Sequence, residues 1–282
     1  GLRIYNSSGW GMFYDTTKMY LLDGPSFEFN HRLQIDNNRI LALPDSVILT
    51  TNSTVENHGQ IRGGENSSLI LKGDTVVGGA FAFSSVHFAN GNHVIREGLY
   101  VEGLMVVDSG AIVRQEDCEP SADSLYVNAT GLYQLGTGNF WLAGNGNSDG
   151  LIDADSGYFG YYGSHQNVIT SGIQYGGLYI STNNSDDTIF VNDDITIDNL
   201  RLSNGILNNG NHLTLRDSGS VYRESGLLTA PVTFGSSVYV SYDLHDTLAF
   251  GNEMPPPSVT LLSLLINNYS GQSIKLDQDR IV

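Results

Sequence analysis

An oxygen-rich segment in the middle of the chain has the spacing of a calcium-binding loop. Over residues 145–156, oxygen-bearing side chains recur at alternate positions, a glycine stands at the sixth place and an apolar residue at the eighth. Such a pattern lets the chain wrap a divalent cation, and the glycine allows the sharp turn. Ser156 stands at the twelfth place instead of a bidentate Glu, so an ordinary acidic turn is the alternative interpretation. The predicted Ca²⁺ ligands are the side chains of Asn145, Asn147, Asp149 and Asp153 and the carbonyl of Leu151.

Aromatic residues gather on both sides of this segment. Flat aromatic faces held on rigid elements suit the stacking of sugar rings, and the polar tips of Tyr and Trp can form hydrogen bonds. The alternative is that these side chains pack against the body of the fold, as large apolar groups commonly do. The candidate carbohydrate-binding residues are Trp141, Tyr158, Tyr161, Tyr162 and Tyr175.

The ionisable residues do not form a recognisable catalytic set. Paired carboxylates stand at residues 186–187 and 193–194, and glycosidases use two carboxylates at a set separation. A lyase would need a basic residue beside its substrate, but the chain has only three widely spaced lysines. His93 and His212 occupy equivalent repeat positions, which favours structural roles. We therefore predict no catalytic residues and no enzymatic activity, with a polysaccharide lyase or glycoside hydrolase as the alternative.

The composition narrows the range of partners. With 13 basic and 30 acidic residues the formal charge is −17, so we expect neither nucleic acid nor an anionic membrane surface as a partner. No apolar run approaches the ~20 residues that span a bilayer, so we expect no membrane insertion. Cys118 is the only cysteine, which excludes an internal disulfide, and stability must come from packing.

Recurring segments indicate that the candidate residues belong to a repeat protein. Residues 33–41 return as residues 274–282, with the same alternation and the same Asp-x-x-Arg-Ile core. Two further motifs recur in the same order but with different spacing: residues 91–94 and 108–114 are echoed by residues 210–213 and 217–223. Because the strand cores are kept while the spacing varies, a solenoid is favoured over a propeller.

Short alternating segments between Asn, Asp and Gly turns indicate an all-β fold. Apolar residues at every second position over three to five residues are typical of half-buried strands, and 33 glycines supply positive-φ turns. We predict a right-handed parallel β-helix, a solenoid with projecting loops, in which coils of roughly 20 residues make about twelve coils in all. A β-sandwich is the alternative, because alternation alone does not reveal strand direction.

The expected organisation is a cap, a solenoid and one interruption. Residues 1–26 are expected to form an N-terminal cap or transition segment, and residues 27–282 the solenoid. A loop-rich insertion is expected at about residues 133–179, where glycine and aromatic residues interrupt the pattern. Because residues 274–282 have the pattern of an interior coil, we expect either a fragment of a longer repeat protein or a neighbouring subunit that covers this end.

Two stretches resemble a known family. Residues 195–215 and 261–271 are similar to the repeat coils of large secreted β-helix proteins of the Bacteroidota, and the similarity covers residues 181–282 well and 27–115 more loosely. The resemblance implies export by the type IX system, a secreted or cell-surface location and an adhesin-like role as an extended stalk or binding scaffold. It implies other protein chains, further repeats of the same polypeptide or polysaccharide as partners. The rival function is a carbohydrate-active β-helix that binds or cleaves polysaccharide.

Asp-Ser/Thr-apolar triplets resemble the sites that carry O-glycans in exported proteins of those bacteria. Turn chemistry before strands is the alternative origin of such a three-residue pattern. The resemblance implies glycosylation sites at Thr16, Ser46, Thr75, Ser124, Thr188 and Thr247.

Overall fold

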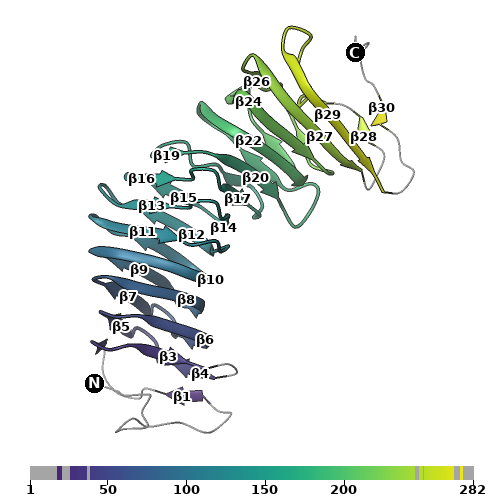
Figure 1. Cartoon of the computed structure of the whole chain (residues 1–282). Coiled ribbons are helices and arrows are strands. Elements are labelled where there is room, and N and C mark those ends of the chain that lie inside the picture. The colour runs from purple at the N-terminus through teal and green to yellow at the C-terminus, as the bar shows by residue number, and fades with distance from the viewer. Residues whose placement is uncertain are drawn as a thin grey trace. The chain divides into compact units, whose positions relative to one another are not determined.

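The computed structural model describes residues 18–20, 26–36, 39–244, 248–249, 251–269 and 274–275. Every regular element in these residues is a β-strand, and the strands stack in parallel ladders (Figure 1). This arrangement confirms the predicted parallel β-solenoid and excludes the sandwich of antiparallel sheets.

Among the described residues, no helix is long and apolar enough to cross a membrane.

Two compact units make up the chain. Unit 1 contains Gly1–Phe140 and Asn147–Asp153, and unit 2 contains Trp141–Gly146 and Ala154–Val282. Each is described by itself below.

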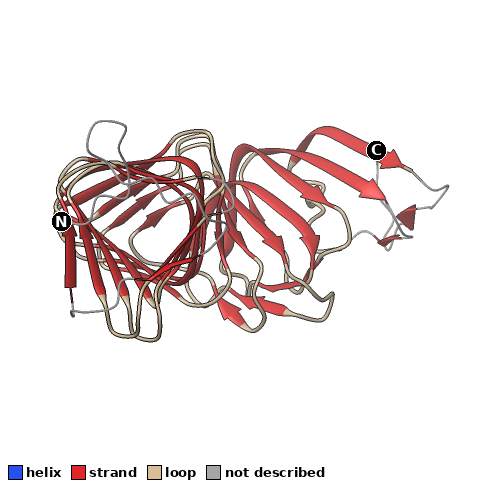
Figure 2. Ribbon diagram, turned by 90° about the horizontal axis from the view of Figure 1, so that it is seen from below, coloured by secondary structure: helices blue, strands red, loops and turns tan. Residues whose placement is uncertain are grey.

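Unit 1 is built from three ladders of parallel strands, which Figure 2 shows superposed from coil to coil. The first ladder contains β2 (Ser26–Phe29), β5 (Ile48–Thr51), β7 (Ser68–Lys72), β9 (Ser85–Ala89) and parts of β10 (Gly91–Val107) and β12 (Ser121–Val127). The second contains β3 (Leu33–Ile35), parts of β6 (Val55–Arg62), β8 (Thr75–Ala82) and β10, then β11 (Ala111–Gln115), β13 (Leu132–Gln134) and β16 (Leu151–Asp153). The third contains β1 (Lys18–Tyr20), β4 (Ile40–Ala42) and the remaining parts of β6, β8, β10 and β12.

The strand register gives the length of a coil. In unit 1, Leu33 pairs with Val55, so these coils are 22 residues apart. Thr75 pairs with His93 after 18 residues. The predicted coil of roughly 20 residues is therefore confirmed, and the variation is absorbed at the turns.

Inward side chains of successive coils lie over one another in columns. One column in the first ladder of unit 1 contains Leu49, Leu69, Val86, Met105 and Leu125. Each is at most 1% exposed, because alternation turns every second side chain inward and the coils above and below cover it. Burial of such a side chain stabilises the fold by about 1.5–3 kcal/mol. A single coil cannot provide this burial for itself.

Glycine is required at one corner of unit 1. β8 passes from one ladder to the next at Gly79, whose φ of +98° lies in the region that favours glycine. A Cβ at this position would lie 1.9 Å from the main-chain oxygen of Asn57 in the preceding coil. Asn57 is itself buried, and its Nδ2 donates a hydrogen bond to the carbonyl of Ala80 at 2.6 Å. Backbone geometry and one buried amide therefore define the corner.

Unit 2 repeats the same construction. Its longest ladder contains β17 (Tyr158–Tyr161), β20 (Gly177–Ser181), β22 (Ile195–Asn204), β24 (Leu213–Arg223), β27 (Ser237–Leu244) and β29 (Thr260–Asn268). A second ladder contains β18 (Gln166–Asn167), β21 (Thr188–Phe190), β23 (Ile206–Asn208) and β25 (Leu227–Leu228). β24 also pairs with β26 (Thr233–Phe234), and β28 (Leu248–Ala249) pairs with β30 (Ile274–Lys275).

The segment 133–179 was expected to be a loop-rich insertion, and the structure shows it as short coil strands joined by turns and loops. Besides β13 and β16–β18 it holds β14 (Phe140–Leu142), β15 (Gly146–Ser148) and β19 (Ile173–Gln174). Its aromatic residues face inward at several places, where they fill the core in place of aliphatic side chains. The fully buried rings are those of Tyr133, Phe140, Phe159 and Tyr161.

The two ends of the solenoid are described only in part. Of the expected cap at residues 1–26, β1 is described with the first residue of β2, and β1 pairs in register with β4 as an ordinary ladder strand. Of the repeated motif at residues 274–282, only β30 lies within the described residues.

Core columns predict a sharp contrast between two isoleucines of unit 1. Ile61 is 0% exposed and Ile48 is 41% exposed. Ile61→Ala should lower the free energy of unfolding by about 2–5 kcal/mol, because a cavity remains between two coils. Ile48→Ala should change it by about 0.5 kcal/mol or less. Urea denaturation followed by circular dichroism measures both, and equal losses would contradict the columnar core.

Candidate functional site

The most organised cluster on the outer surface of unit 2 is a row of stacked flat side chains. Tyr179, Arg201 and Tyr222 occupy register-paired positions on β20, β22 and β24. The guanidinium of Arg201 lies 4.5 Å from the ring centroid of Tyr179 and 4.8 Å from that of Tyr222. Trp141 extends the row, with its ring centroid 4.6 Å from that of Tyr179. Parallel register therefore produces a continuous cation–π and aromatic stack, here called the outer row.

A glycine makes room for the indole in the outer row. Gly160 pairs with Tyr179, so it stands in the row at the place where another side chain would point outward. A Cβ on Gly160 would lie 2.5 Å from a ring atom of Trp141. The indole therefore lies flat against the backbone of β17.

Carboxylates fix the polar groups of the outer row. Arg201 donates to Glu224 at 3.0 Å, and the hydroxyl of Tyr222 donates to Asp243. Burial opposes the charge of Arg201, but the hydrogen bond to Glu224 and nearby negative charge outweigh it and raise its pKa. Burial and the bond to Asp243 raise the pKa of Tyr222. Nε of Arg201 is buried and, among the described residues, has no hydrogen-bond partner.

A shallow hollow of about 380 Å³ lies beside the outer row. All of its lining residues belong to strands of unit 2, and they combine tyrosine rings, serine hydroxyls and one arginine. The side chains that line the hollow include those of Tyr158, Arg201, Ser220, Tyr222, Tyr239, Ser241, Ser263 and Leu265.

The structure divides the predicted carbohydrate platform into two groups. Tyr161 and Tyr175 lie in the core, at most 3% exposed, and their hydroxyls are 2.8 Å apart. Burial raises the pKa of both hydroxyls. Trp141, Tyr158 and Tyr162 are partly exposed. The ring of Tyr158 approaches that of Tyr179 at 6.1 Å, and the ring of Tyr162 approaches that of Trp141 at 6.4 Å.

Tyr179 was among the aromatic residues expected near the platform, but sequence reasoning missed three residues of this surface: Arg201, Tyr222 and Tyr239. Tyr179, Arg201 and Tyr222 are spaced by 22 and 21 residues, which is one coil length each time. That spacing was the available signal. It becomes visible only once the coils are aligned on one another.

The predicted calcium ligands lie along two strands joined by a turn. Asn147 is on β15, Leu151 and Asp153 are on β16, and Asp149 lies in the turn between them. The hydroxyl of Tyr126 donates to the carboxylate of Asp149. No group of three or more His, Cys, Asp or Glu side chains placed to hold a metal occurs in the described part of the chain. Calcium binding through Asn145 and these residues stays a prediction.

The predicted O-glycan positions differ in accessibility. Ser46 is exposed in a turn, with φ of 59°, and Ser124 and Thr188 are partly exposed in strands. Thr75 is 2% exposed, and its hydroxyl lies 2.7 Å from Nδ1 of His93. Thr16 and Thr247 lie outside the described residues.

The two histidines at equivalent repeat positions have different surroundings. His93 is fully buried, where Nε2 lies 3.2 Å from the carbonyl of Ala89 and the ring meets Phe88 edge-on at 5.3 Å. His212 is partly exposed, and its Nδ1 lies 2.8 Å from the carboxylate of Asp194. Asp193, the other member of that carboxylate pair, accepts a hydrogen bond from Thr170.

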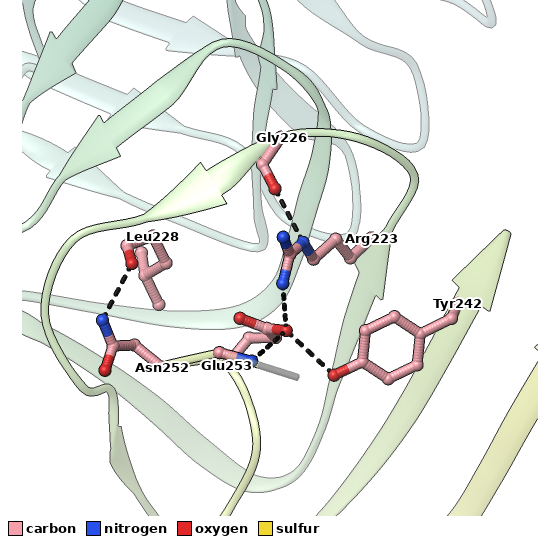
Figure 3. Close-up of polar contacts among 7 residues, drawn as sticks. Arg223, Gly226, Leu228, Tyr242, Asn252 and Glu253 are labelled. Carbon is pink, nitrogen blue, oxygen red and sulfur yellow. Dashed lines mark hydrogen bonds and ion pairs between the residues drawn. The ribbon is translucent and has the colours of Figure 1, made fainter. Parts of the chain in front are cut away.

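A buried ion pair lies inside unit 2 (Figure 3). The side chains of Arg223 and Glu253 are 4% and 0% exposed and form a direct pair. The same carboxylate oxygen accepts from the hydroxyl of Tyr242 at 2.9 Å and from the amide of Gly251 at 3.0 Å. Nε of Arg223 donates to the carbonyl of Gly226 at 2.7 Å. The cluster ties the segment before β29 to the interior of the coil, so its arrangement is that of a structural anchor.

The single cysteine is enclosed in unit 1. Cys118 is 9% exposed, and its Sγ lies 3.4 Å from the carbonyl of Ile95. Burial, assisted by neighbouring carboxylates, raises the pKa of the thiol to about 11. The thiol is therefore protonated and unreactive at neutral pH.

Comparisons with protein-family models, with curated proteins and with solved structures found no match.

The buried ion pair predicts an asymmetry between two conservative substitutions. Glu253→Gln leaves Arg223 buried without its counter-charge and should lower the free energy of unfolding by about 3–5 kcal/mol. Asp198→Asn breaks the pair with Arg216, in which both side chains are about half exposed, and should cost about 1 kcal/mol or less. Urea denaturation of both variants decides the matter, and a small loss for Glu253→Gln would refute the anchoring role.

Burial of His93 predicts a pH dependence of stability. Desolvation lowers the pKa of His93, against opposing contributions from the Ala89 carbonyl and Asp74. The unfolded chain, whose histidine pKa is about 6.5, therefore binds the proton first, and the folded state loses stability as the pH falls below that value. His93→Gln removes the titration. The stability advantage of wild type over this variant should shrink between about pH 7.5 and 5, and a constant difference would contradict the assignment.

Proposed function

We propose that the chain is a structural, adhesin-like segment of a secreted or cell-surface bacterial repeat protein, acting as a stalk or binding scaffold. The observation that supports it best is the stacking of coils, in which inward columns are fully buried and backbone groups are paired along each ladder. Such a body holds its outer side chains in fixed rows and lets them vary without disturbing the core. Those rows are what a scaffold presents.

The acidic balance of the chain favours partners other than nucleic acid or anionic membranes. We propose further repeats of the same polypeptide or other protein chains as partners. Export by the type IX system, calcium binding at residues 145–153 and O-glycosylation belong to the same proposal, and Ser46 has the most accessible of the described acceptor positions.

The rival is a β-helix that cleaves polysaccharide. The hollow beside the outer row is the observation that favours contact with sugar. The nearby carboxylates are engaged or enclosed: Glu224 is bound by Arg201 and one oxygen of Asp243 by Tyr222, and the other oxygen of Asp243 is buried. A general acid or base has to be free to exchange a proton with the substrate, so we propose that the chain is not an enzyme.

Surface location gives a direct test of the proposed function. Antibodies against the purified chain should label intact cells of the bacterium that encodes it, or its culture medium, and external protease should remove the cell-bound signal. Labelling that requires permeabilised cells would contradict the proposal. Purified chain incubated with pectin, alginate and neutral glucans should release neither unsaturated products nor new reducing ends, and release that Arg201→Ala abolishes would establish the rival function.

A further inference from the structure

The hollow on the outer face of unit 2 arises from a checkerboard of large and small side chains. Along one row of paired positions, Tyr239 lies between Ser220 and Ser263. Along the neighbouring row, Ser241 lies between Tyr222 and Leu265. Each small residue therefore stands beside large ones, and the serines form the floor from which the rings rise. Register makes this pattern as regular as the core columns.

Tyr239 is the exposed ring at the centre of this pattern. Its side chain is 47% exposed, and its neighbours in the row on both sides are serines that do not cover it. A tyrosine offers a large rigid face at a low cost in conformational entropy. Ser220, Ser241 and Ser263 line the hollow around this face, and the hydroxyl of Ser220, which donates to Asn199 at 2.6 Å, can still accept a hydrogen bond. The combination of one stackable ring with several hydroxyls matches the apolar C–H face and polar rim of a sugar ring.

The part of the hollow formed by β24 and β27 offers no backbone groups for pairing with a peptide strand. It lies on the face of the ladder, where the main-chain groups of β24 and β27 are used by neighbouring strands. Peptides that add a strand to a sheet need a free edge. A ligand stacked on Tyr239 of β27 is therefore held by side chains.

Charge selects a neutral ligand. Arg201 is the cation that lines the hollow, and Glu224 neutralises it at 3.0 Å. The hydroxyl of Tyr222 is turned toward the carboxylate of Asp243. The net charge of Arg201, Glu224 and Asp243 is therefore negative, in a chain of formal charge −17. A uronate or sialate would be repelled, whereas an uncharged hexose would not.

We propose that this hollow binds a neutral, hexose-based glycan, with one sugar ring stacked on Tyr239 and its hydroxyl groups hydrogen-bonded to the surrounding serines. The volume of about 380 Å³ falls within the ~300–1,000 Å³ typical of small-ligand sites. The site deepens the proposed function, because it names a ligand class for a scaffold whose outer rows are held rigid.

Calorimetric titration with hexasaccharides of β-1,4-glucan, α-1,4-glucan and β-1,4-mannan, beside a hexagalacturonate, tests the proposal. At least one neutral hexasaccharide should bind, and hexagalacturonate should bind more weakly than that one. Tyr239→Ala should weaken binding about tenfold, whereas Tyr239→Phe keeps the ring and should retain it. Tyr100→Ala removes a tyrosine of similar exposure, 43%, from unit 1 and should leave binding unchanged.

Three results would each overturn the assignment of a neutral-glycan site. They are no binding of any of the three neutral hexasaccharides, tighter binding of hexagalacturonate, and unchanged binding by Tyr239→Ala. Thermal unfolding of Tyr239→Ala shows whether it remains folded. Cell-surface labelling is measured independently of glycan binding. If the chain is labelled on the cell surface but binds no glycan, the glycan site is refuted and the proposed scaffold function is retained. If the chain binds glycan but resides inside the cell, the surface-scaffold function is refuted and the glycan site is retained.

Discussion

Parallel register between neighbouring coils is the constraint on which the rest of the structure depends. Each strand inside a ladder forms backbone hydrogen bonds with the coils on either side, and paired positions place their side chains in rows. A slip of one residue would turn an inward row outward, so the alternation in every coil has to agree with that of its neighbours. The buried column from Leu49 to Leu125 and the partly exposed outer row from Trp141 to Tyr222 are two results of the same kind of pairing. The same pairing therefore sets both which side chains are buried and where the outer side chains lie.

Polar groups inside the solenoid lie where the geometry of the coil requires them. Asn57 closes a corner against a carbonyl, and His93 contacts a threonine of the preceding coil. Arg223 and Glu253 hold the connecting segment that precedes β29. Removing charges from water costs several kcal/mol per ion, roughly what the pairing returns, so such a cluster selects one arrangement of the segment more than it adds net stability. Specificity at the connections is thus supplied by hydrogen bonds, and cohesion of the coils by apolar burial.

Much of the fold could be predicted from the sequence, because each coil has to bury alternate side chains against its neighbours and therefore repeats the same pattern. Alternation and the recurrence of short motifs indicated parallel coils of roughly 20 residues, and the register confirms this. The short coil strands within residues 133–179 were not predicted, because strands of two to four residues are too short to show alternation and their glycines resemble those of loops. Alternation also did not reveal that Tyr161 and Tyr175 would be core residues while Tyr179 points outward. Those directions depend on where each coil turns, which composition does not encode.

The buried thiol of Cys118 can report local opening of the solenoid through its rate of chemical labelling. A protonated sulfur beneath a coil corner reacts with labelling reagents only when that corner separates from its neighbours. Because the sequence holds one cysteine, the rate of labelling reports a single location without any engineered probe. The same enclosure keeps an unpaired thiol from oxidation or crosslinking in an oxidising medium for as long as the coil stays closed. In a solenoid, where neighbouring coils open together, that rate reports how readily the coils around Cys118 separate from one another.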